Sequence, residues 1–280
     1  MTGPCRSSAW HPCELRYNSG QVHLTGVQPL IILVSPAKKL NEERARGQAT
    51  TVPRFLDQAA ELAGVARTWS EDEIAKLMGI SATLAKLNKD RFAAWSGDGQ
   101  CAAGLMFDGD VYKELEPATF DDVTKDAAQR RLRILSGLYG LLRPTDAIEA
   151  YRLEMGRKTP GHPAGTLYGF WGDKIAAAIV EEARELGVGS VLNLASEEYA
   201  KAVPPKALGD LTLISPRFEE ERGGSRKVIG VAAKRARGAM ARWVLENGIT
   251  EADDLKGFTV GGYAFDAETS APQRPIFVRG

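Results

Sequence analysis

A serine and a lysine follow the first apolar run of this chain, where side chains of α/β proteins often bind ligands. Residues 30–34 are continuously apolar and rich in β-branched side chains, which predicts a buried strand. Ser35 and Lys38 come directly after it, at the carboxyl end of that strand. They therefore qualify as ligand-binding groups. The alternative is that Ser35 starts a turn and Lys38 is solvated.

Other charged residues are spaced in ways that suggest chemistry. Asp108 and Asp110 flank a glycine, so they could bind a hard cation or position a base; a polar turn is the simpler interpretation. Arg152 and Glu154 are two residues apart and would share one face of a strand, which could equally be a solvated edge. A second predicted buried strand, 190–195, also ends in polar side chains.

The densest positive cluster lies on a predicted helix over 232–243. Its members are Lys234, Arg235, Arg237 and Arg242. Such a cluster fits a phosphate-bearing partner. The alternative is a solvated face that is balanced by the acidic run 219–221.

A helical hairpin is predicted between about residues 70 and 95. Ser70 and Glu73 form a capping box, and Gly79-Ile80-Ser81 makes a tight turn before a second helix that begins after Ser81. Apart from Ser81, which stands where a second glycine is usual, the spacing fits a helix-hairpin-helix. Free amides at such a turn can bind DNA phosphates without reading sequence. The further predicted contacts are Thr83, Lys86 and Lys89. A hairpin without a ligand is the alternative.

The elements that must position these side chains are predicted from hydrophobic periodicity. Apolar residues at three- and four-residue steps predict helices over 53–66, 128–142 and 167–186. Strand patterns predict a long hairpin of 211–218 with 227–231 and edge strands at 258–266 and 276–278. We therefore expect one α/β domain with a mixed central sheet surrounded by helices.

Composition excludes several classes of protein. Lys plus Arg and Asp plus Glu number 36 each, so net charge favours no partner. The three histidines and three cysteines show no zinc-site spacing, and sparse cysteines fit a reducing cytoplasm. We predict no bound metal, no cofactor and no membrane association. Residues 1–29 lack periodicity, which predicts a disordered extension; a start codon assigned too far upstream would give the same pattern, and we favour that explanation.

Seven motifs in order give the sequence a specific resemblance. They are SPAK, GDVY, LSGLYGLLRP, YRLEMG, FWGD, NLAS with EEY, and AKRARG with Met and Arg after it. Together they resemble the peroxide stress protein YaaA family from Leu30 to the C-terminus. The resemblance implies a single α/β domain over 30–280 and DNA binding through a helix-hairpin-helix and a positive cleft. It also implies survival of hydrogen peroxide by lowering free intracellular iron and limiting oxidative DNA damage.

The motif positions supply a candidate cleft. Its predicted residues are Ser35, Lys38, Asp110, Tyr112, Arg143, Arg152, Glu154, Asn193, Ser196 and Glu198. The predicted DNA-binding residues are Gly79, Ile80, Ser81, Thr83, Lys86, Lys89, Lys234, Arg235, Arg237 and Arg242. The chain departs from the family at Lys39, where threonine is common, and at Asp108, where lysine is usual. The change from lysine to Asp108 alters the local charge by two units, which argues against anion binding at that edge.

Two functions remain open at this stage. One is a DNA-binding stress protein that contacts phosphates largely independently of sequence. The other is an enzyme that acts on a phosphorylated or nucleoside-like small molecule, a possible anionic ligand, in a cleft where distant charged motifs converge. Buried charges are costly unless they are paired or used, which favours such convergence. The sequence assigns no catalytic residue.

Overall fold

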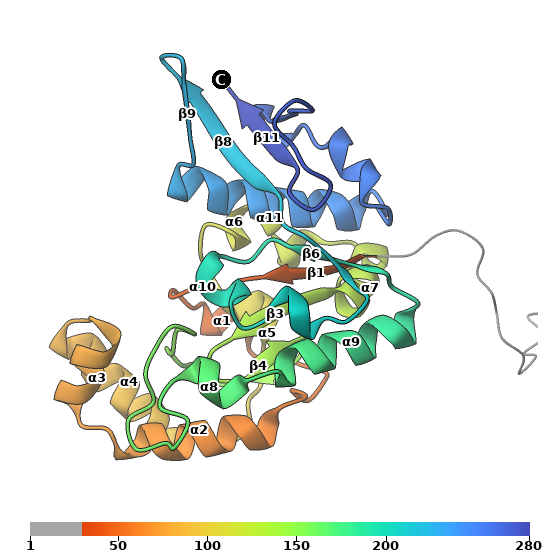
Figure 1. Ribbon diagram of the computed structural model, residues 1–280. Coiled ribbons are helices and arrows are strands. Elements are labelled where there is room, and N and C mark those ends of the chain that lie inside the picture. The colour runs from red at the N-terminus through yellow and green to blue at the C-terminus, as the bar shows by residue number, and fades with distance from the viewer. Residues whose placement is uncertain (1–29) are drawn as a thin grey trace, which may run out of the picture.

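The computed structural model describes residues 30–280 and shows an α/β protein in stacked layers (Figure 1). The predicted extension, residues 1–29, lies outside the described residues. The strands of the central sheet are β1 (Leu30–Val34), β3 (Leu132–Ser136), β4 (Gly140–Leu142), β6 (Ser190–Asn193) and β7 (Thr212–Ile214). Their spatial order is β4-β3-β1-β6-β7, and only β4 pairs antiparallel. The predicted mixed sheet is therefore confirmed.

The first strand lies at the centre of this sheet. Every residue of β1 is buried, which explains why the strand is a continuous apolar run and shows no alternation. Its two neighbours, β3 and β6, are both parallel to it, and the chain reaches β3 on one side before it crosses to β6 on the other. Strand order therefore reverses around β1. In open α/β sheets, the crevice at such a reversal is where ligands bind.

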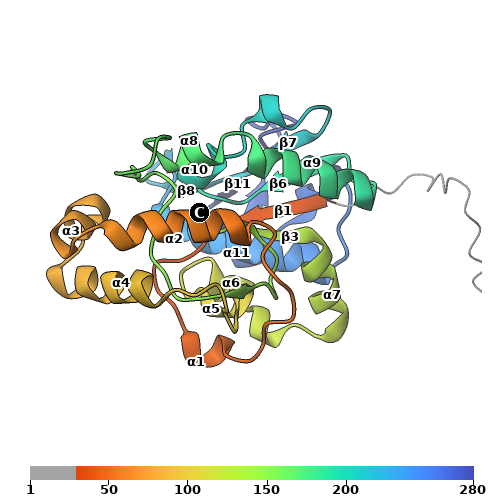
Figure 2. The same cartoon turned by 90° about the horizontal axis from the view of Figure 1, so that it is seen from below.

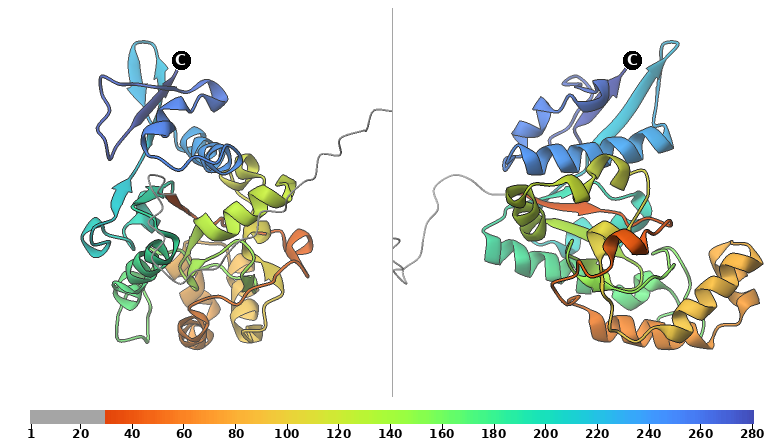
Figure 3. Two further views of the ribbon diagram at one scale, coloured as in Figure 1. Left: turned by 90° about the vertical axis from the view of Figure 1, so that its right-hand side faces the viewer. Right: turned by 180° about the vertical axis from the view of Figure 1, so that it is seen from behind.

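A second sheet lies above the first in Figure 1, with a long helix between them. Its strands are β10 (Ala264–Phe265), β11 (Ile276–Arg279), β8 (Arg217–Arg222) and β9 (Ser225–Lys227), in that spatial order. The helix is α11 (Gly230–Glu246), and the side views of Figure 3 show the same layering. Two edge strands were expected, at 258–266 and 276–278. The first corresponds to β10, which is an edge strand, but the second is β11, which is an inner strand. The hairpin predicted across Gly223 and Gly224 is present as β8–β9, but its second strand ends at Lys227 and does not reach residue 231, because α11 begins at Gly230.

Helices cover the other faces of the central sheet. The longer ones are α2 (Leu56–Thr68), α3 (Glu71–Met78), α4 (Ala82–Ala94), α7 (Asp122–Arg131) and α9 (Lys174–Leu186). The short ones are α1 (Glu42–Ala45), α5 (Ala103–Met106), α6 (Tyr112–Leu115), α8 (Leu167–Trp171) and α10 (Glu197–Ala200). A small two-stranded sheet joins β2 (Cys101–Ala102) to β5 (Ala147–Ile148). Seen from below, α2 runs across the molecule and α3 and α4 project from its end (Figure 2).

The predicted helix over 128–142 is wrong. Helix α7 ends at Arg131, and the following residues form the β3–β4 hairpin. All residues of both strands are buried and most of them are apolar, so their spacing matches that of an apolar helix face by coincidence. The turn between the two strands requires glycine at position 140, because Gly140 has a φ of +68° and a Cβ there would lie 2.6 Å from the Trp171 ring.

Two other predictions need correction. The helix expected over 167–186 is broken into α8 and α9 at Gly172, whose φ and ψ of 47° and −126° are not helical. The strand expected over 211–218 is split between the two sheets: β7 pairs with β6, and β8 pairs with β9 and β11. Pro216 lies at the split, where its missing N–H prevents a continuous ladder. The helix expected over 53–66 is confirmed as α2.

The α3–α4 hairpin agrees closely with its prediction. Ser70 and Glu73 form the capping box, and Gly79 adopts the left-handed conformation, with a φ of 62°. The Ser81 side chain then caps α4 by accepting a hydrogen bond from the Leu84 N–H. The structure thus shows a helical hairpin, and its action as a DNA-binding helix-hairpin-helix stays a prediction. Within residues 30–280, no helix combines the length and apolarity that crossing a membrane requires.

Candidate functional site: a charged cleft at the carboxyl ends of the central strands

The cleft begins where β1 and β6 end side by side. The backbone N–H of Ser196 donates a hydrogen bond to Oγ of Ser35 at 2.8 Å, and the two hydroxyl oxygens are 3.3 Å apart. The Tyr112 hydroxyl donates to the backbone carbonyl of Ser35 at 3.1 Å. The first strand, the loop before α10 and helix α6 are therefore joined at one point, and that point lies at the strand-order reversal.

Glu154 organises one wall of the cleft. Its side chain is only 6% exposed, and it contacts three cations. Nε of Arg152 lies 3.0 Å from Oε1, Nε of Arg157 lies 3.1 Å from Oε2, and Nζ of Lys38 lies 3.8 Å from Oε1. A buried carboxylate carries a large desolvation cost unless cations such as these pair with it. Because the cations outnumber it, this cluster carries excess positive charge.

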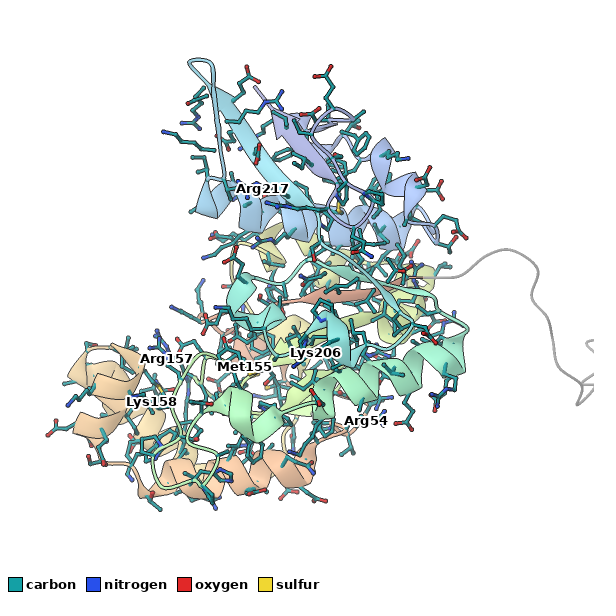
Figure 4. The ribbon with its side chains drawn as sticks, in the orientation of Figure 1. Arg54, Met155, Arg157, Lys158, Lys206 and Arg217 are labelled. Carbon is teal, nitrogen blue, oxygen red and sulfur yellow. The ribbon has the colours of Figure 1, made fainter. Side chains whose placement is uncertain are left out.

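Arg157 also connects the cleft to the helical hairpin. Its Nη1 donates a hydrogen bond to the carbonyl of Leu77, in the last turn of α3, at 3.1 Å. Figure 4 labels Arg157 between the hairpin and the body of the molecule. Sequence reasoning did not select this residue, although it lies three positions after Glu154. The motif YRLEMG ends one residue earlier, and the i, i+3 charge spacing was the signal that could have found it.

Two glycines bring the opposite wall close. A Cβ at Gly109 would lie 2.8 Å from that of Ala37, so this loop packs directly on the segment after β1. A Cβ at Gly238 would lie 2.0 Å from the carbonyl oxygen of Val111, so α11 approaches the segment before α6 at backbone distance. These contacts place Lys234 and Arg237 of α11 in the same cleft as the residues around Asp110.

The complete cleft has a volume of about 700 Å³. Its charged lining residues are Lys38, Lys39, Lys113, Arg152, Lys234 and Arg237 together with Asp108, Asp110, Glu154, Glu197 and Glu198. Lys39 is paired with Asp108 at 2.5 Å. The positive charge of Lys39 therefore neutralises the aspartate that replaces the usual lysine, and Asp108 does not form an ion pair with any other described cation of the cleft. The Lys39 pairing also holds the pKa of Asp108 below its ordinary value.

Five charged side chains of the cleft make neither a hydrogen bond nor an ion pair with another described residue. They are the cations Lys113, Lys234 and Arg237 and the carboxylates Asp110 and Glu197. Arg237 is half-buried, and burial lowers its pKa, while the charge of Glu197 acts in the opposite direction. Unpaired charged side chains in a concave site are typical of groups that bind a ligand.

Buried phenols form part of the cleft floor. Burial raises the pKa of Tyr112, Tyr151 and Tyr199 above the ordinary value of 10.0. They therefore stay protonated at neutral pH and act as hydrogen-bond donors, as Tyr112 does toward Ser35. Among the described residues, no group of three or more His, Cys, Asp or Glu side chains is arranged to hold a metal ion.

Most of the predicted cleft residues are brought together. Eight of them line the cleft, namely Ser35, Lys38, Asp110, Tyr112, Arg152, Glu154, Ser196 and Glu198. Two predicted members lie elsewhere. Arg143 pairs with Asp146 and lines a separate hollow of about 370 Å³ that Arg54 also borders. Asn193 bridges strand ends, with its amide nitrogen donating to Ser215 Oγ at 3.1 Å and its oxygen accepting the Ala195 N–H.

The predicted DNA-binding residues fall into three groups. Lys234 and Arg237 line the cleft. The hairpin carries the second group, in which Ile80 is half-buried and the exposed residues are Gly79, Ser81, Thr83 and Lys86. Arg235 is half-exposed on α11, and its Nε lies 3.8 Å from Oε1 of Glu114. Lys89 and Arg242 have internal roles: Nζ of Lys89 donates to the carbonyls of Arg67 and Trp69, and Arg242 bonds Thr119, Glu116 and Glu246.

Fold and site together define a single-domain α/β protein with a charged ligand cleft at the carboxyl ends of its central strands. Comparison with known proteins agrees with this class. A profile of the peroxide stress protein YaaA family matches residues 30–269. The chain belongs to this family, whose name connects it with peroxide stress.

Three relatives illustrate the similarity. A UPF0246 protein of Ruegeria pomeroyi is 45% identical over 254 residues, which cover 89% of this chain and 98% of the relative. A UPF0246 protein of Jannaschia sp. is 45% identical over 252 residues, with 89% and 97% covered. A UPF0246 protein of Paraburkholderia phytofirmans is 44% identical over 257 residues, with 89% and 98% covered.

Proposed function

We propose that this protein acts in the peroxide stress response by binding DNA through phosphate contacts, on a surface formed by the α3–α4 hairpin and the cleft. The observation that carries the proposal is the double contact of Arg157, which bonds Glu154 in the cleft and the Leu77 carbonyl in the hairpin. The two phosphate-binding candidates are thereby held in a fixed relation. The hairpin lies on the side of the molecule toward which β1 runs (Figure 1), and the cleft is lined by Ser35, the residue that follows β1.

The exposed cations of this surface are available to phosphate. Lys86 is paired with Asp90, but its side chain is 63% exposed, and Arg235 is 52% exposed beside Glu114. Ion pairs this exposed are worth about 0–1 kcal/mol, so a DNA phosphate can displace the carboxylate. The Ile80 N–H already bonds the Ala75 carbonyl, so the uncharged phosphate donors at this turn are the first N–H groups of α4, ahead of the Leu84 N–H that Ser81 caps. None of these groups reads bases, so binding would be largely independent of sequence.

The peroxide role does not need the described cysteine. Burial is the main cause that raises the pKa of the Cys101 thiol above its ordinary value. A thiol reacts with peroxide as the thiolate, so a raised pKa makes Cys101 a slow target. We therefore place the protective action on the DNA and regard the lowering of free iron as an indirect effect. Cys101→Ser should leave peroxide survival of a complemented deletion strain unchanged.

The test is the salt dependence of DNA binding. Fluorescence anisotropy with a random-sequence duplex should give a steep fall of affinity with salt, and the double variant Lys86→Ala with Arg235→Ala should reduce the slope by about 2, since each lost phosphate contact removes about 0.9. The matched control is Lys206→Ala with Arg184→Ala, which removes the same charge at exposed positions outside both the cleft and the hairpin. Figure 4 labels Lys206 well away from the hairpin. Equal slopes for the two double variants would refute this surface.

An enzyme that acts on a phosphorylated small molecule is the second candidate. The observation that favours it is the position of the cleft at the strand-order reversal around β1. Turnover of such a compound by the purified protein, abolished in Asp110→Asn, would support it.

A further inference from the structure

The size of the cleft limits what can enter it. Its volume of about 700 Å³ lies within the range of about 300–1,000 Å³ that is typical of small-molecule sites. A DNA duplex is far too wide for it, since its major groove alone is about 12 Å across. The cleft therefore admits one nucleotide-sized unit, while a duplex would stay outside on the hairpin and the rim.

The cationic wall on α11 is suited to a phosphate. Lys234 and Arg237 are three residues apart on one helix, so their side chains leave the same face. Neither has a hydrogen-bonding or ion-pairing partner among residues 30–280, whereas the cations of the opposite wall are held by Glu154. An ammonium and a half-buried guanidinium can together donate several charge-assisted hydrogen bonds to phosphate oxygens.

The same cleft also provides acceptors for hydroxyl groups. Asp110 makes no hydrogen bond or ion pair with any described residue, and its carboxylate can accept from two hydroxyls. It cannot favour the phosphate itself, because like charges repel. A ligand that satisfies both walls must carry an anionic group and neutral hydroxyls a short distance apart. A sugar phosphate has this arrangement.

We infer that the cleft binds one nucleotide-sized sugar phosphate, with its phosphate on Lys234 and Arg237 and its sugar hydroxyls on Asp110. The ligand has two sources with the same chemistry, a free nucleoside monophosphate or a terminal or unstacked nucleotide of a DNA strand. For the second source the inference rests on the proposed DNA binding; for the first it stands without it.

The experiment uses the full chain and four probes. Calorimetric titration with thymidine 5′-monophosphate, thymidine and inorganic phosphate tests the free source, and anisotropy with a 5′-phosphorylated single-stranded oligothymidylate tests the DNA source. Lys234→Ala should weaken binding by about tenfold or more, as expected for a lost charge-assisted bond. Lys206→Ala is the matched control and should change nothing. Arg237→Gln is the second variant, and the melting temperatures of the unliganded variants verify that each folds.

The outcomes separate the possibilities. Binding of the monophosphate, lost in Lys234→Ala and absent for thymidine, supports the inference with the free source. Binding of the oligonucleotide alone, weakened by both cleft variants, supports it with the DNA source. Oligonucleotide binding that neither cleft variant changes, with no monophosphate binding, overturns the inference while the proposed function survives. Inorganic phosphate that binds as tightly as the monophosphate overturns the role of Asp110 and hence the sugar-phosphate assignment. Failure of every probe overturns the inference, whether or not duplex DNA binds.

Discussion

The cleft and the α3–α4 hairpin are built by different kinds of contact. The cleft joins groups that are far apart in the chain: Ser35 and Ser196 are separated by 161 residues, and Glu154 meets Lys38 across more than a hundred. The hairpin is made almost entirely by neighbours, with a capping box between residues three apart and a left-handed glycine between its helices. Arg157 is the described side chain that bonds to both.

This difference determines how each region fails. The elements around the cleft approach one another closely at glycines, and at Gly238 the contact is with backbone, so a single added methyl group there must displace an entire element. The hairpin has open space around its turn and depends on conformation and caps, whose individual contributions are small. Substitutions should therefore have large effects in the cleft and graded effects in the hairpin.

The largest expected effect is that of Gly238→Ala. The added Cβ would lie 2.0 Å from the Val111 carbonyl oxygen, and α11 must move to relieve the clash, at a cost of about 3 kcal/mol of unfolding free energy. Gly79→Ala is the matched comparison, because its φ of 62° strains an alanine in open space and should cost about 1 kcal/mol. Urea unfolding measures both. Equal losses would remove the distinction between the two regions.

Glu154→Gln should follow in size. The substitution removes the buried negative charge that Arg152, Arg157 and Lys38 share. We expect it to lower the free energy of unfolding by about 2 kcal/mol. This is less than for a fully buried ion pair, because Lys38 and Arg157 are partly exposed. Thermal unfolding monitored by circular dichroism would measure it. Glu198→Gln, at the exposed rim, is the control and should cost much less. A neutral result for Glu154→Gln would show that these cations do not depend on it.

Arg157→Ala tests the connection between the two regions. It removes the hydrogen bond to the Leu77 carbonyl, so amides of α3 and α4 should exchange with solvent several-fold faster, while those of β1 and β6 stay protected. Hydrogen exchange followed by mass spectrometry would detect this. Lys158→Ala, at the adjacent exposed position, serves as the control. If α3 and α4 exchange at unchanged rates, the hairpin is held by its own packing alone.

The smallest effect should be a pH dependence within the hairpin. The Ser70 N–H bonds the Glu73 carboxylate and lowers its pKa below the ordinary value of 4.5. Its stabilisation is therefore complete above pH 4.5 and is lost as the pH falls through the lower folded-state pKa. The melting temperature of Glu73→Gln should be slightly below wild type at pH 7, with the gap narrowing toward pH 3. Asp72→Asn, without the capping bonds, should show a smaller gap at pH 7.

The local character of the hairpin also explains why its prediction succeeded. Ser70, Glu73 and Gly79 carry their structural meaning in short sequence spacings, and each adopts the expected role. Periodicity failed over 128–142 because strands buried on both faces have no alternation, so they share the apolar spacing of a core helix. The apolar runs 30–34 and 190–195 still predicted two strands of the central sheet. The hydroxyl groups of Ser35 and Ser196, which follow these two runs, lie 3.3 Å apart.

The cleft could be predicted only as a set of residues and not as a geometry. Motif positions indicated Lys38, Asp110 and Glu154, and the structure brings them together. The same reasoning also included Arg143 and Asn193, which do not line the cleft, because a motif does not show whether a residue faces a cleft or supports a strand end. The sequence separates Lys234 from Arg242 only through Glu246, which lies four residues after Arg242 on the same helix. The other partners of Arg242, Glu116 and Thr119, lie more than a hundred residues earlier and cannot be assigned to it from the sequence.

The central position of β1 has a consequence for biosynthesis. This strand is made early, yet its partner β6 emerges from the ribosome more than 150 residues later, and the bond between Ser35 and Ser196 must wait for it. Until β6 is made, the apolar strand β1 is not fully buried. Slow, long-range strand pairing of this kind favours aggregation of nascent chains. Under oxidative stress, when chaperones are in demand, the yield of this protein should therefore depend on how its first strand is protected during synthesis.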